Sequence, residues 1–142
     1  MRNTIARRGF ASLILLALSG VLWAEVPDVK QQNGIDYLTG GVGLEESTAI
    51  KEEAKRWPLQ VMMSELSEGK AVWIADAELR IKNQNNRLLL DIKCDGPFAL
   101  IRLDPGKYTI EATFNGMAQK RQVLVVSGSP QQISITWKAN LR

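Results

Sequence analysis

Apolar and polar side chains alternate along most of the chain after Pro58. Ala77, Leu79 and Ile81, for example, fall on one face of an extended segment, with charged residues between them. Side chains of a β-strand point alternately to its two faces, so a period of two is typical of strands with one buried face. About seven such runs, separated by polar or glycine-rich turns, predict a mostly β protein. Its expected core is a seven-stranded antiparallel β-sandwich over residues 59–138.

Two turn signals stand in the middle of this pattern. Asn115-Gly116 predicts a tight hairpin, because both central residues of a type I′ turn need a positive φ. Asp104-Pro105-Gly106 predicts a second turn, with Pro105 at the first corner and Gly106 at a second corner of positive φ. Both turns are expected to fix the register of a strand meander.

One helical pattern precedes the predicted strands. In residues 43–57, Ile50, Ala54 and Trp57 recur at helical spacing and form one apolar stripe. We therefore expect one short amphipathic helix before the sandwich. Residues 25–42 are polar and show little periodicity, so they are predicted to form an extended or mobile lead.

The first 24 residues have the pattern of a secretory signal peptide. A cationic start is followed by an apolar run from Phe10 to Leu18, a Ser19-Gly20 break, and Ala24 as the cleavage position. The run is shorter than the roughly 20 apolar residues needed to cross a bilayer. The sequence thus predicts a periplasmic or secreted protein without stable membrane insertion after cleavage. The alternative is an uncleaved N-terminal anchor.

The net charge of +3 is misleading as an indication of partners. Three of the 18 basic residues, Arg2, Arg7 and Arg8, lie within the predicted signal peptide, and without them the basic residues only balance the 15 acidic ones. Binding of nucleic acid needs lysines and arginines clustered on one face. No such cluster is found, so we do not expect nucleic acid as a partner.

Cys94 is the only cysteine, which excludes an intrachain disulfide. It follows Leu88, Leu90 and Ile92 at a spacing of two residues, on the apolar face of a predicted strand. A free cysteine in that setting behaves as a small buried hydrophobe, and we predict that Cys94 is buried. Pairing with another chain is the alternative.

Several segments together resemble a known family, the carboxypeptidase regulatory-like domains. These segments are DGPF at Asp95–Phe98, LDPGKY at Leu103–Tyr108, and the terminal Trp137. The acidic lead GGVGLEE at Gly40–Glu46 is similar to that of small exported proteobacterial members. The resemblance covers Gly40–Lys138. It implies a transthyretin-like (prealbumin-type) β-sandwich in a supporting role, without the zinc catalytic domain that accompanies it in carboxypeptidases.

Catalytic chemistry finds little support in the residue types. The chain has no histidine, which removes Ser-His-Asp and Cys-His constellations and the usual zinc ligands. Asp91 and Glu78 fall on the polar faces of their predicted strands and are most simply solvated surface groups. The sequence predicts no cofactor and no metal site. A small cell-envelope hydrolase based on carboxylates, or an accessory subunit of one, stays as the alternative function.

The tryptophans and the glycine-rich segment provide the candidate binding residues. Trp57 and Trp137 are predicted to be core anchors. Trp73 lies in a short apolar run, and burial is the favoured prediction; an exposed Trp73 would instead be a binding anchor.

The segment GGVGLEE is most simply a flexible turn with acidic residues at a helix start. Its functional alternative is a recognition surface at the sandwich edge, with Tyr37, Glu45 and Glu46 as contacts. The sequence therefore predicts a non-enzymatic periplasmic module that binds an envelope protein or a peptide. Strand addition at a sheet edge is an available mode of binding.

Overall fold

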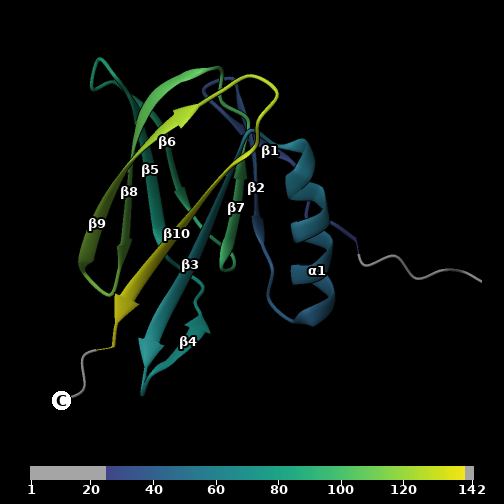
Figure 1. The fold of residues 1–142 in the computed structure, drawn as a ribbon, viewed down its shortest axis with the longest axis vertical. Helices are drawn as coiled ribbons and strands as arrows, with labels where there is room; N and C mark the ends of the chain where they lie inside the picture. Colours follow the sequence, from purple (N-terminus) through teal and green to yellow (C-terminus); the bar gives the residue numbers. More distant parts are fainter. Residues whose placement is uncertain (1–24, 140–142) are drawn as a thin grey trace, which may run out of the picture.

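The computed structural model describes residues 25–139, so the predicted signal peptide and its cleavage position lie outside the described residues. Two β-sheets and one α-helix make up the fold (Figure 1). The elements are β1 (Lys30–Gln32), β2 (Ile35–Gly40), α1 (Leu44–Glu53) with a 3₁₀ turn (Ala54–Arg56), β3 (Leu59–Ser67), β4 (Lys70–Trp73), β5 (Glu78–Asn83), β6 (Leu88–Lys93), β7 (Phe98–Ile101), β8 (Gly106–Phe114), β9 (Met117–Val125) and β10 (Gln131–Lys138).

The two sheets pack face to face around one core. The first sheet has the order β1-β2-β7-β3-β10, with β4 pairing the far half of β3, and the second has the order β6-β5-β8-β9. Val61 and Ile135 of the first sheet and Leu79 and Ile110 of the second are all fully buried in this core. The alternation of apolar side chains along these strands explains the contact, because each sheet turns one apolar face inward.

Helix α1 covers the outer face of the first sheet. Ile50, Ala54 and Trp57 pack there against Phe98 and Leu100 of β7 in a second, smaller cluster. The predicted apolar stripe is therefore confirmed. No helix among residues 25–139 is long and apolar enough to cross a membrane.

The strand count and the pairing differ from the sequence prediction. The described residues form ten strands rather than seven, and β10 pairs with β3 in parallel instead of antiparallel fashion. The sequence places residues 25–42 outside the sandwich as an extended or mobile lead, whereas β1 and β2 of this range are extended strands of the first sheet. Strand β2 is an interior strand of the first sheet, with Tyr37 opposite Ile101 and Gly40 opposite Phe98 of β7.

Of the two predicted turns, one is confirmed. Asn115 and Gly116 have φ values of 49° and 77° and join β8 to β9 as a tight hairpin. Gly106 instead starts β8 with φ of 159°, far from the roughly +80° of a type II corner. The segment is held differently: the Tyr108 hydroxyl donates a hydrogen bond to the Asp104 carbonyl over 2.6 Å.

Cys94 is buried, as predicted. Burial, aided by the nearby Asp95 carboxylate, raises the pKa of its thiol to about 12. Leu90 is buried with it, but Leu88 is 37% exposed. The reason is a register irregularity between Ile81 and Lys82 of β5, which shifts the end of β6 relative to its neighbour.

Side chains close the sandwich along one flank. The Gln32 amide donates to the Asp91 carbonyl over 3.1 Å and accepts from the Asp91 backbone N–H over 2.7 Å. The Asn33 amide donates to the Leu89 carbonyl over 3.0 Å. These amides occupy the outer edge of β6 as a neighbouring strand would, and thus protect that edge from pairing with other chains.

The opposite flank is closed by contacts between β9 and β10. The Trp137 indole N–H donates to the Met117 carbonyl over 2.9 Å, and the Gln119 amide donates to the Thr136 carbonyl over 2.7 Å. Trp137 is 1% exposed and is a core anchor, as predicted. Both flanks of the sandwich therefore have side chains across their edges.

Candidate functional site

Strand β3 is much longer than its neighbour β7, and this difference creates the candidate site. The first part of β3, Leu59–Met62, pairs with β7, and the last part, Ser64–Ser67, pairs with β4. The two short strands therefore lie end to end on the same side of β3. They meet at Met63, whose N–H donates to the Pro97 carbonyl over 2.8 Å and whose carbonyl accepts from Ile74 N–H over 3.4 Å.

Strand β2 does not continue past β7. The chain leaves the sheet at Gly41, whose φ is 99°, and a second left-handed residue, Gly43 with φ of 86°, leads into α1. A side chain at Gly41 would collide with the Phe98 ring. The Glu46 carboxylate accepts the Gly41 N–H over 2.7 Å and fixes the turn. The two glycines thus end β2 and turn the chain toward α1. Glycine suits both positions because it adopts a positive φ without steric cost.

A hollow of about 460 Å³ lies between this turn and β4. We call it the Trp73 hollow. It is open to solvent at the position where a longer β2 would run beside β4, and Figure 1 shows β4 beyond the end of β7, apart from α1. Its lining residues are Gly41, Val42, Gly43, Leu44, Ser47, Lys51, Trp73, Ile74, Ala75 and Pro97.

Trp73 is 50% exposed, so the prediction that it is buried is wrong. Its ring packs on Phe98 with 5.1 Å between the ring centroids. Val42 and Leu44, which line the same hollow, are also more than half exposed. The reason is the length of the β3–β4 hairpin, which extends past the part of the sheet that α1 covers. All four residues of β4 are therefore exposed.

Lys51 of α1 lies over the aromatic pair. Its Nζ is 5.9 Å from the Trp73 ring centroid and 5.6 Å from that of Phe98. None of the ion pairs found within the described chain involves Lys51. The hollow therefore combines an apolar wall with an ammonium group that is free to meet an anionic partner.

The structure separates the predicted binding residues. Trp73 lines the hollow together with the glycine-rich turn, and Glu45 is exposed at the adjoining helix start. Glu46 is engaged in the turn through its bond to Gly41. Tyr37 is partly buried against the core between the sheets and lies outside the Trp73 hollow. The sequence did not predict Lys51 as a binding residue. The only signal for it was its position next to Ile50 in the predicted helix.

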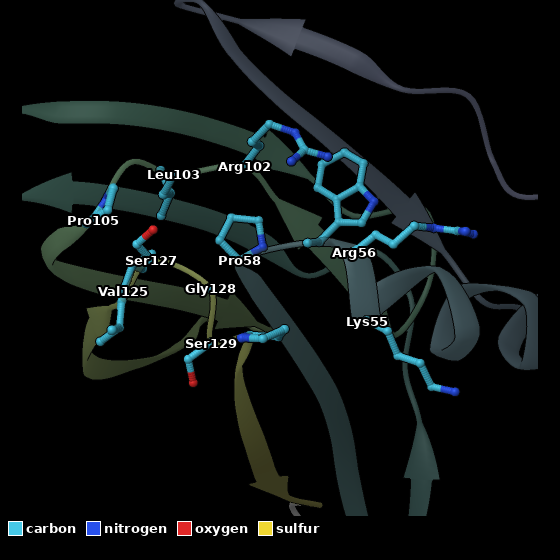
Figure 2. Close-up of a pocket in the computed structure, with 13 residues that line it drawn as sticks. Lys55, Arg56, Pro58, Arg102, Leu103, Pro105, Val125, Ser127, Gly128 and Ser129 are labelled. Carbon is cyan, nitrogen blue, oxygen red and sulfur yellow. The ribbon is translucent and has the colours of Figure 1, made fainter.

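A second hollow, of about 350 Å³, lies at the other end of α1 (Figure 2). Its wall includes Pro58, Leu103 and Pro105. Lys55 and Arg56 also line it, but Figure 2 shows both side chains pointing away from its centre. The cations therefore do not converge on a common point, and the hollow lacks the geometry of an anion site.

The charged groups around this second hollow are already paired. Lys55 and Arg56 bind the carboxylates of Glu52 and Glu53 over 2.8 Å and 2.7 Å. Hydrogen bonds from Arg56 and then from the Trp57 indole lower the pKa of Glu53. The guanidinium carbon of Arg102 stacks on Trp57, 4.6 Å from its ring centroid.

The acidic residues considered for hydrolysis lie on the outer surface of the second sheet. Asp91 is 3.4 Å from Arg80 and pairs with it. Glu78 is exposed. In the part of the chain that the structure describes, no group of three potential metal-ligating acids or cysteines was found.

No family model and no curated protein sequence matches this chain. The resemblance to carboxypeptidase regulatory-like domains therefore stays a prediction from the residues quoted above.

Proposed function

We propose that this chain is a non-enzymatic module of the bacterial periplasm that binds a segment of another envelope protein through the Trp73 hollow. The observation that carries the proposal is the half-exposed Trp73 ring beside Lys51. Tryptophan is enriched among the residues that dominate interface energies, and large apolar side chains gathered on a surface mark interaction sites. Export rests on the signal-peptide pattern of the first 24 residues.

The proposal includes a prealbumin-type sandwich of the carboxypeptidase regulatory-like family as the scaffold. Two facing sheets and a mostly β composition support it, together with the segments Asp95–Phe98 and Leu103–Tyr108. The role of this scaffold is to present the β4 hairpin and the glycine-rich turn at one end of the molecule.

Site-specific crosslinking in living cells tests the proposal. We expect Val42→p-benzoylphenylalanine, which places a photoreactive group in the wall of the Trp73 hollow, to give a discrete crosslinked product with one envelope protein. The matched control is Leu124→p-benzoylphenylalanine on β9, because Leu124 and Val42 are both exposed apolar residues, at 54% and 64%. Adding Trp73→Ala should reduce the Val42 product at least fivefold. The same product from both positions, or none from Val42, would contradict the proposal.

A further inference from the structure

We infer that the free edge of β4 takes up an extended peptide segment as an additional strand, one carrying an apolar side chain and, two residues away, a carboxylate. This inference rests on the proposed function and deepens it, since it names the mode of binding and the chemistry of the segment.

Most of the sheet edges are already occupied or blocked. The amides of Gln32 and Asn33 bond to the edge of β6, and Trp137 and Gln119 connect β9 to β10. Strand β1 has only three residues. Strand β4 has β3 on one side and no strand on the other within residues 25–139. Its four residues Lys70–Trp73 are all exposed.

The hairpin geometry shows which backbone groups of β4 face outward. Glu68 and Gly69 both have positive φ, 51° and 77°, which defines a two-residue turn of type I′. The pair Ser67 and Lys70 that flanks such a turn exchanges hydrogen bonds, and bonded and non-bonded pairs then alternate. Leu66 and Ala71 therefore form a non-bonded pair, as do Ser64 and Trp73.

Two observed contacts agree with this alternation of bonded and non-bonded pairs between β3 and β4. The Leu66 carbonyl accepts from Ala139 N–H over 2.9 Å, on the side of β3 away from β4. Ile74 N–H donates to the Met63 carbonyl, which places that pair among the bonded ones. The N–H and C=O groups of Ala71 and Trp73 thus point away from β3, toward the position of a missing neighbour. An added strand would satisfy these groups.

The side chains around this edge define the peptide chemistry. Trp73 and Leu44 offer apolar contact, and Leu44 is 82% exposed. Lys51 projects its ammonium over the Trp73 ring without a carboxylate partner among the described residues. On one face of a strand the neighbours are two residues apart, so an apolar residue and an acidic residue separated by one position can meet Trp73 and Lys51 together. Charge complementarity thus favours an acidic segment.

The test uses a nine-residue probe peptide in which threonine alternates with valine, leucine, glutamate and valine. Its dissociation constant is measured by NMR titration of the protein, together with the exchange rates of the Ala71 and Trp73 backbone amides. We expect binding to slow both exchange rates at least tenfold. A peptide with glutamine in place of glutamate should bind about threefold more weakly, and Lys51→Met should abolish this difference.

The decisive variant is Ala71→Pro, which removes an outward N–H without removing a bond to β3. We expect Ala71→Pro to weaken probe binding about tenfold relative to the control Ala71→Ser, which keeps the N–H. If Trp73→Ala abolishes binding while Ala71→Pro and Ala71→Ser bind alike, strand addition is wrong and the proposed function stands. Absence of probe binding, or protection of these amides by a concentration-dependent dimer, also overturns the inference. In that case the crosslinking experiment still tests the proposed function separately.

Discussion

The tryptophans show how differently single residues of one type act in this protein. Trp137 is buried in the core, whereas half of Trp73 meets solvent. We expect Trp137→Ala to reduce the free energy of unfolding by about 3–5 kcal/mol, because it leaves a large cavity and removes the bond to the Met117 carbonyl. Trp73→Ala should cost only about 1 kcal/mol, chiefly the tilted ring contact with Phe98. Urea denaturation measures both, and equal losses would contradict the assigned burial.

Cys94 makes the stability dependent on alkaline pH. Burial raises the pKa of its thiol from 9.0 to about 12, so in this range the unfolded chain loses the proton and the native chain keeps it. This contribution to stability is complete below pH 9 and decreases by about 1.4 kcal/mol per pH unit between pH 9 and 12. Cys94→Ala should lack that slope.

The measurement for Cys94 is the difference in unfolding free energy between the native protein and Cys94→Ala from pH 8 to 11. Burial also raises the pKa of Tyr108, but that residue is present in both proteins and cancels in the difference. Parallel curves for the two proteins would show that the thiol is not protected.

At the scale of elements, the β1–β2 hairpin covers the edge of β6 with its side-chain amides. Gln32→Leu removes two hydrogen bonds to the backbone of Asp91 and should lower stability by about 1–2 kcal/mol. Gln31→Leu is the matched control, since the Gln31 amide bonds only to the Asp36 carboxylate on the surface. Faster amide exchange at Asp91 in Gln32→Leu, but not in Gln31→Leu, checks this role. Equal exchange rates of the Asp91 amide in both variants would contradict this role of Gln32.

The turn between β2 and α1 gives a second comparison at this scale. Gly41→Ala forces a left-handed φ on alanine and also places its Cβ against the Phe98 ring, so it should cost several kcal/mol. Gly43→Ala has the same strain with open space around it, and should cost only about 1 kcal/mol. Thermal unfolding of the two variants distinguishes them. Similar melting temperatures would show that Gly41 is not in contact with Phe98.

Across the whole molecule, the sequence predicts what depends on local pattern and misses what depends on pairing. Alternation places Leu79 and Ile81 in the core correctly, because only one face of β5 is buried. Strand β2 has Tyr37 against the sandwich core and Leu38 against the helix cluster. Both of its faces pack, so no alternation appears. The parallel pairing of β10 with β3 joins distant segments and leaves no local signal.

The candidate site was predictable only in part for the same reason. The glycine-rich turn and Trp73 could be nominated from residue type. Whether Trp73 is covered depends on where α1 begins over the sheet, which no local pattern reports. The place of Lys51 above the ring depends on the packing of α1 against β7.

Amide hydrogen exchange of the free protein tests most directly the claim that β4 has an open edge. We expect fast exchange for the Ala71 and Trp73 amides, which point away from β3, and slow exchange for the Val72 amide between them, which faces Glu65 across the hairpin. Slow exchange at all three amides in the monomeric protein would mean that the edge of β4 is already occupied, and would contradict the claim of an open edge.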